Sequence, residues 1–116
     1  MRYMLLIYSD ENYEAAMTPP EQEAYMGRYF EFTKEVRARG LFDSGEPLHP
    51  TNMATSVRIR DGQTLATDGP FAETKEQLGG FYILNCKDLD EAIALAAKIP
   101  AAEHGTIEIR PVVEFE

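Results

Sequence analysis

The chain has 116 residues and a formal net charge of −9, and 44% of its residues are hydrophobic. This length fits one domain, and the apolar content is too high for a disordered chain. The acidic excess argues against nucleic acid, whose binding depends on Lys and Arg neutralising phosphates. Apolar runs such as residues 4–8 are far shorter than the ~20 residues that span a bilayer. We therefore expect one domain over residues 1–116 that binds no nucleic acid and no membrane.

Two further patterns concern cellular location and metals. The first residues lack the charged, apolar and small-residue regions of a secretory leader, so we expect a cytoplasmic protein. The single cysteine, Cys86, cannot form an internal disulfide and reads as a small buried hydrophobic residue. No set of Cys and His has the spacing of a zinc site, and the sequence contains no P-loop or GxGxxG fingerprint. We therefore expect no metal and no cofactor.

The N-terminal segment predicts a strand over residues 2–9. Alternate side chains of a strand point to opposite faces, and here both faces are apolar. One face carries Tyr3, Leu5 and Ile7, and the other carries Met4, Leu6 and Tyr8. Such a strand is expected to be covered on both sides. An acidic connection over residues 10–17 follows it.

A long helix is expected over residues 19–39. Thr18 and Glu21 have the spacing of a capping box, and Gly40 suits the position just after a helix. Four apolar or aromatic residues recur at helical spacing and define the buried stripe: Tyr25, Tyr29, Phe32 and Val36. Met26 and Phe30 widen that stripe.

The second half of the chain predicts shorter strands and a second helix. The strands are expected over residues 41–50, 54–60, 64–67, 78–86 and 106–114. Asp61-Gly62 is a strong signal for a hairpin turn, whereas residues 68–77 show no clean period. A helix is expected over residues 89–99, ended by Pro100.

This order of elements predicts an α+β fold of the ferredoxin-like βαββαβ type, elaborated by an extra hairpin over residues 54–67. Its antiparallel sheet carries two helices on one face. The other face, with Met4, Leu6 and Tyr8, is also apolar and must be buried by something. We therefore expect a homodimer in which a second copy stacks sheet to sheet.

Residues 67–81, TDGPFAETKEQLGGF, form the most distinctive motif of the chain. This segment resembles the DGPF signature of the YCII-related family of small bacterial proteins. Residues 2–8, 54–58 and 108–112 are also similar to that family, so the resemblance spans almost the whole chain. It implies a dimeric ferredoxin-like fold of the dimeric α/β-barrel type.

The resemblance implies less about chemistry. Some YCII relatives carry an apparent His–Asp pair, and alignment on Gly40 places Tyr29 and Ala38 at those two positions here. The pair is absent, so a dehydrochlorinase-type activity does not carry over. Relatives of the DGPF type are often linked to extracytoplasmic-function sigma factors, which implies an accessory role beside such a protein partner.

The DGPF loop has a physical interpretation of its own. Pro70 stiffens the loop, and Asp68 is a candidate general base or polar anchor. Phe71, Glu73 and Lys75 are candidate ligand-binding residues around it. The alternative is structural: Asp68 caps a turn, Phe71 fills the core or an interface, and the two charged side chains are solvated.

Four other residues are candidates on chemical grounds. His49, in a loop flanked by prolines, is a candidate acid–base residue, with a solvated side chain as the alternative. Tyr29 is expected either to line a cleft or to pack in the core. Arg58 is expected either to bind an anion or to be solvated. His104 is expected to act on the C-terminal end of the second helix.

Two functions from different classes follow from these candidates. The first is a small-molecule site, with possible enzymatic acid–base chemistry, beside the DGPF loop near the dimer interface. The second is a non-catalytic accessory protein that binds a sigma factor.

Overall fold

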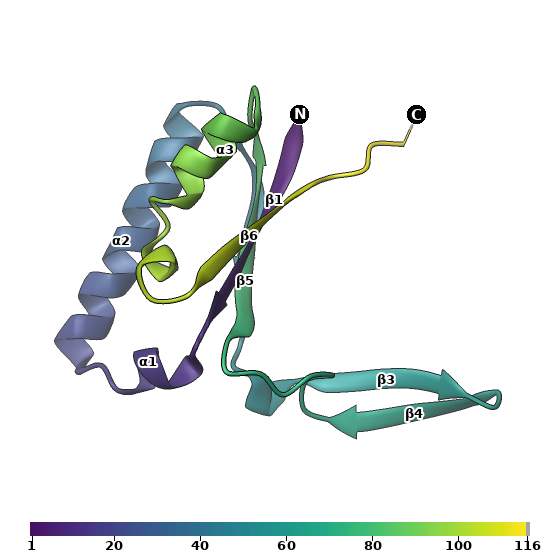
Figure 1. The fold of residues 1–116 in the computed structure, drawn as a ribbon. Helices are drawn as coiled ribbons and strands as arrows, with labels where there is room; N and C mark the ends of the chain where they lie inside the picture. The colour runs from purple at the N-terminus through teal and green to yellow at the C-terminus, as the bar shows by residue number, and fades with distance from the viewer. Residues whose placement is uncertain (116) are drawn as a thin grey trace.

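The computed structural model describes residues 1–115. The chain forms an α+β fold (Figure 1). Its elements are β1 (Arg2–Ser9), α1 (Glu11–Ala15), α2 (Pro19–Ala38), β2 (Phe42–Pro47), η1 (Thr51–Met53), β3 (Thr55–Arg60), β4 (Gln63–Asp68), β5 (Gln77–Asn85), α3 (Leu89–Ala96), η2 (Pro100–Glu103) and β6 (Thr106–Pro111).

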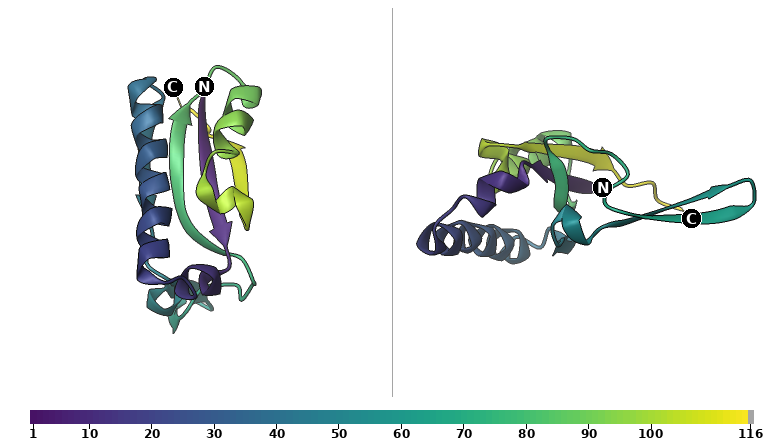
Figure 2. Two further views of the ribbon diagram at one scale, coloured as in Figure 1. Left: turned by 90° about the vertical axis from the view of Figure 1, so that its left-hand side faces the viewer. Right: turned by 90° about the horizontal axis from the view of Figure 1, so that it is seen from below.

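A four-stranded antiparallel sheet forms the centre of the protein, in the order β2-β5-β1-β6. Strand β1 lies between β5 and β6, with Leu5 opposite both Tyr82 and Ile109. Helices α2 and α3 both pack on one face of this sheet (Figure 2). The central position of β1 explains why its sequence is apolar on both faces.

The residues at the two ends of α2 explain where this helix begins and where it ends. The Thr18 hydroxyl accepts a hydrogen bond from the backbone N–H of Glu21, and the Glu21 carboxylate accepts one from the N–H of Thr18. At the other end, Gly40 has a φ of 71°, and the N–H of Leu41 donates to the carbonyl of Val36. This is a Schellman ending, which glycine adopts without a steric penalty. The predicted capping box and C-terminal glycine are therefore confirmed.

The hydrophobic core lies between the sheet and the two helices. Leu5, Val36, Leu84, Leu95 and Ile99 are fully buried there. Cys86 is also buried, and burial raises the pKa of its thiol, so it behaves as the small hydrophobic residue that the sequence predicts.

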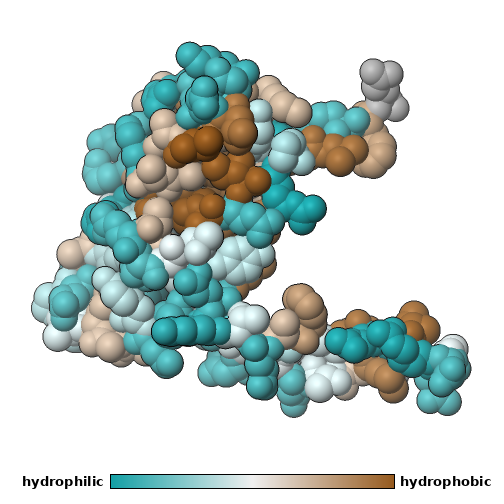
Figure 3. All heavy atoms as spheres, viewed as in Figure 1, coloured by the Kyte–Doolittle hydropathy of each residue, from teal (hydrophilic) through white to brown (hydrophobic). Residues whose placement is uncertain are grey.

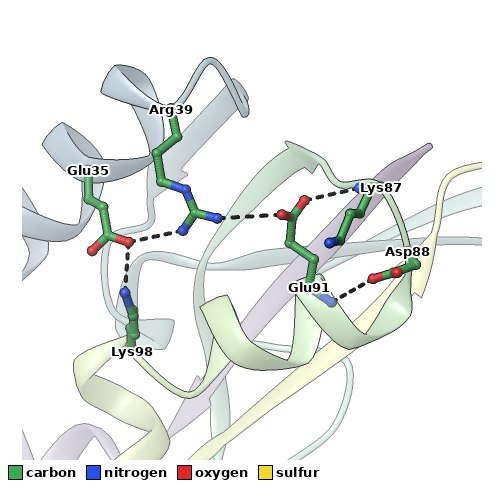
Figure 4. A network of polar contacts seen from close by, with 6 residues as sticks. All are labelled: Glu35, Arg39, Lys87, Asp88, Glu91 and Lys98. Atoms are coloured by element: carbon green, nitrogen blue, oxygen red, sulfur yellow. Dashed lines mark hydrogen bonds and ion pairs between the residues drawn. The ribbon is translucent and has the colours of Figure 1, made fainter.

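A surface network ties α2 to α3 beside this core (Figure 4). The Glu35 carboxylate accepts hydrogen bonds from Arg39 at 3.2 Å and from Lys98 at 2.8 Å. Arg39 also reaches Glu91 at 3.4 Å, and the Glu91 carboxylate accepts the backbone N–H of Lys87. These neighbouring cations lower the pKa of Glu35. These ion pairs lie at the protein surface, where such pairs contribute little to stability.

Strands β3 and β4 form a separate two-stranded sheet. Asp61 and Gly62 have φ values of 51° and 73°, which is the backbone of the tight turn that this dipeptide predicts. The hairpin projects from the body, away from α2 and α3 (Figures 1 and 2). Val57 and Ile59 on this hairpin are 62% and 65% exposed, which is unusual for a β-branched pair on one face.

The sheet face opposite the helices has no covering element among residues 1–115. Met4, Leu6 and Tyr8 on this face are only half-buried, whereas Tyr3, Leu5 and Ile7 are buried beneath the helices. Figure 3 shows a broad recess on this side, between the hairpin and the C-terminal segment. The radius of gyration is 16.1 Å, against roughly 13 Å for a compact chain of this length.

The structure departs from the sequence expectations in the bounds of several elements. The strand expected over residues 41–50 is limited to Phe42–Pro47, and the strand expected over residues 106–114 ends at Pro111.

The acidic connection contains α1, a one-turn helix whose N-cap Asp10 accepts the backbone N–H of Asn12. Helix α3 ends at Ala96 rather than near residue 99. Pro100 favours an extended backbone at the residue before it, and Ile99 has a ψ of 126°.

Candidate functional site

A cavity of about 620 Å³ lies between α2, the β2 edge of the sheet and α1. Its volume falls within the roughly 300–1,000 Å³ that small-molecule sites occupy. Helix α2 contributes the side of its surface that faces β2, including Met26, Tyr29, Phe30 and Thr33. Phe32 and Val36 of the same helix belong to the hydrophobic core, and Tyr25 lines the cavity together with these residues.

The wall formed by the sheet includes aromatic side chains. Phe42 and Tyr82 line it, and the guanidinium of Arg37 lies 4.0 Å above the ring of Phe42. The hydroxyls of Thr33 and Tyr82 are hydrogen-bonded at 2.9 Å, and burial raises the pKa of Tyr82. This wall therefore offers apolar faces with paired hydroxyls, which suits an aromatic or aliphatic ligand.

The small helix α1 closes one end of the cavity. The Glu11 carboxylate accepts the hydroxyl of Thr51 at 2.5 Å and its backbone N–H at 2.8 Å. This clamp ties α1 to η1, so the segment over residues 48–50, which includes His49, is held beside the cavity.

Four aromatic rings meet beside the cavity, and two of them, Tyr25 and Tyr29, also line it. The hydroxyl of Tyr25 and Nε2 of His104 are 2.9 Å apart, and Tyr13 stacks on the imidazole with 3.7 Å between ring centroids. Tyr29 meets Tyr25 edge to face at 5.4 Å. Burial raises the pKa of both Tyr25 and Tyr29, so both stay neutral phenols at neutral pH.

Two of the candidate residues predicted from the sequence lie at this cavity. His49 lines it from the loop after β2, and Tyr29 lines it from α2. His104 belongs to a different place than expected: it follows η2 rather than the end of α3, and it contacts Tyr25. The cavity therefore combines aromatic side chains of α2 with an imidazole from the loop after β2.

The other candidates lie away from the cavity. Asp68 is the exposed last residue of β4, Arg58 is exposed on β3, and Glu73 and Lys75 are exposed in the following loop. Phe71 is 81% exposed and fills neither the core nor the cavity of this chain. The DGPF loop itself is held by Ser56, whose hydroxyl donates to the carbonyl of Gly69 at 2.7 Å. Any ligand role for these residues stays a prediction.

Among residues 1–115, no cluster of three or more His, Cys, Asp or Glu side chains is placed to hold a metal ion. In the same part of the chain, no helix has the length and apolar character needed to cross a membrane.

The comparison with protein families agrees with the motif over residues 67–81. The YCII-related domain matches residues 1–116, which is the whole chain. The chain belongs to the YCII-related family. An uncharacterized protein of Rhizobium meliloti (strain 1021) is 36% identical to this YCII-related protein over 118 aligned positions. That alignment covers 100% of this chain and 95% of the relative.

Sequence reasoning missed most of the cavity wall of this YCII-related protein. Met26 and Phe30 could have indicated the cavity, because they widen the apolar stripe of α2 beyond what one sheet face covers. No sequence pattern could have indicated the contact between Tyr25 and His104, because the two residues are 79 positions apart in sequence.

Proposed function

We propose that this YCII-related protein binds a small aromatic or aliphatic molecule in the cavity between α1, α2 and β2. The observation that carries the proposal is the composition of the cavity wall. Phe30, Phe42 and Tyr82 supply aromatic surface, and His49 and Tyr29 supply polar groups that fix orientation. A largely apolar cavity with few polar groups is the usual form of a small-molecule site.

The fold and assembly belong to the same proposal. We infer a ferredoxin-like βαββαβ arrangement, supported by the strand order β2-β5-β1-β6 and by the two helices on one face. The β3–β4 hairpin is an elaboration of this ferredoxin-like arrangement.

We further infer a homodimer, because a second copy would cover Met4, Leu6 and Tyr8 and the exposed hairpin residues. The DGPF loop would then lie near the interface. A sigma-factor partner stays a prediction.

A matched pair of phenylalanines tests where the ligand binds. Phe30 lines the cavity and is 68% exposed, whereas Phe71 belongs to the DGPF loop and is 81% exposed. Both side chains are exposed, so replacing either by alanine should leave the fold intact. Binding of phenol and indole is measured by amide shifts in a ¹⁵N-labelled sample.

We expect the probes to shift amides of α1, α2 and residues 45–50. Phe30→Ala should weaken binding roughly 2–10-fold, which is the value of one aromatic contact, and Phe71→Ala should leave it unchanged. Shifts confined to the hairpin and the DGPF loop, or a loss of binding only in Phe71→Ala, would contradict the proposal.

A further inference from the structure

Arg37 places a permanent positive charge at the cavity wall. Of the described residues that line the cavity, it is the only Lys or Arg. Its guanidinium carbon lies 4.0 Å from the centroid of the Phe42 ring, and Phe42 belongs to the wall formed by the sheet. Attraction between a cation and the face of an aromatic ring holds the charge at this point. The position of the cation therefore rests on a measured contact as well as on its place in the cavity lining.

The guanidinium of Arg37 has no carboxylate partner within residues 1–115. Every salt bridge in this part of the chain involves another Lys or Arg, although the sequence contains 20 Asp and Glu residues. Arg58 and Arg60 on the hairpin also lack such a partner, but neither lines the cavity. A guanidinium carries five N–H donors in a rigid fork that matches the geometry of a carboxylate. Arg37 therefore brings an unpaired anion-binding group to the cavity.

The acidic lining residues of α1 lie at the other end of the cavity from Arg37. Helix α1 lies beside the start of α2 (Figure 1), where the Gln22 amide donates to the carbonyl of Glu14 at 3.2 Å. Gln22 and Arg37 are about four helical turns apart, which is roughly 22 Å. The carboxylate of Glu11, the other acidic residue of α1 at the cavity, is occupied by Thr51.

The acidic residues of β2 do not neutralise Arg37 either. Glu46 pairs with Phe81, whose neighbour Tyr82 is buried beneath the helices. Alternate residues of a strand point to opposite faces, so Glu46 projects from the sheet face opposite the helices. The carboxylate of Asp43 accepts a hydrogen bond from Arg2 at 2.9 Å. The end of the cavity beside α2 and the start of β2 therefore has a cationic character.

We propose that Arg37 binds a carboxylate group of the ligand, which makes the ligand an aromatic or short aliphatic carboxylate. The apolar part of such a molecule lies against the aromatic wall, and its carboxylate accepts two parallel hydrogen bonds from the guanidinium. The net charge of −9 opposes the approach of an anion, so this ligand class requires a local cation. This inference rests on the proposed function, since it needs the cavity to be a binding site.

Benzoate and benzamide test the inference, because they have nearly the same size and differ in charge. We expect benzoate to bind the wild type more tightly than benzamide, as measured by amide shifts in a ¹⁵N-labelled sample. Arg37→Gln should weaken benzoate about tenfold, the value of a charge-assisted hydrogen bond, and should change benzamide by less than about twofold. Arg37→Lys keeps the charge but loses the fork, so its affinity for benzoate should lie between those of the wild type and Arg37→Gln.

Lys34→Gln is the matched control variant. Lys34 is an exposed residue of the same helix, takes part in no salt bridge within residues 1–115 and is not among the residues that line the cavity. Its replacement removes the same charge from the protein as Arg37→Gln does. We therefore expect Lys34→Gln to bind both probes as the wild type does.

The outcomes separate this inference from the proposed function. If the probes shift amides at the cavity but Arg37→Gln weakens neither probe, or weakens both equally, the inference is wrong and the proposed function stands. The same holds if benzamide binds the wild type more tightly than benzoate. An equal loss of benzoate in Lys34→Gln would also overturn the inference, since the effect would then come from overall charge. If neither probe shifts amides of the cavity in the wild type, both proposals fail.

Discussion

At the scale of single residues, the candidate site residues differ both in side-chain chemistry and in whether the fold places them at the cavity. Asp68 has the side chain of a general base, yet it ends an exposed strand outside the cavity. Tyr29 has an ordinary phenol, yet it lines the cavity and burial raises its pKa. A site needs polar groups that converge on one space, so position decides in favour of Tyr29.

Asp68→Asn tests this distinction. Because the side chain is exposed, we expect the free energy of unfolding to change by less than about 0.5 kcal/mol. We also expect phenol to bind the variant as it binds the wild type, as measured by amide shifts. A variant that keeps its melting temperature but loses the probe would show that Asp68 contributes to the ligand site.

At the scale of elements, close backbone approaches determine which positions tolerate a side chain. A Cβ at Gly105, just before β6, would lie against the carbonyl oxygen of Tyr8 on β1. By contrast, a Cβ at Gly27 in the middle of α2 would meet nothing within 4 Å. The first glycine is required by the packing of β6, and the second costs the helix conformational entropy.

The two glycines make a matched pair of substitutions. Gly105→Ala should destabilise the protein by about 1–3 kcal/mol or more, because backbone must move to admit the methyl group. Gly27→Ala should stabilise it by about 0.5–1 kcal/mol. Urea denaturation measures both. Equal effects of the two substitutions would mean that the β1–β6 contact is looser than described.

Local signals in the sequence predicted the elements well, because their causes are local. The capping box at Thr18 and the turn at Asp61-Gly62 each involve residues close in sequence. Helix α1 was missed because five residues are too few to show a period. The cavity was largely missed because it joins α1, α2 and β2, and its contacts depend on how those elements pack.

At the scale of the whole molecule, a single chain leaves much apolar surface uncovered. One face of the sheet and the β3–β4 hairpin border a recess that no element of residues 1–115 fills (Figure 3). Exposed apolar surface of this kind marks an interaction site, and a two-fold dimer uses the same surface of both copies.

The assembly prediction uses two leucines. We expect light scattering to find a dimer. Leu6→Glu, on the uncovered sheet face, should yield monomer or unfolded protein, because a charge would be buried without a partner. Leu89→Glu, at a half-exposed position on α3, should stay dimeric. A wild-type protein that is monomeric at micromolar concentration would rule out the dimer.

A crystal soaked with 4-bromophenol tests most directly whether the cavity beside α2 binds a small molecule. The anomalous signal of bromine locates the probe without reference to any assay of activity. We predict one bromine per chain within the cavity, in contact with Met26, Tyr29 or Phe30. Bromine found only at the DGPF loop, or no ordered bromine at saturating concentration, would contradict it.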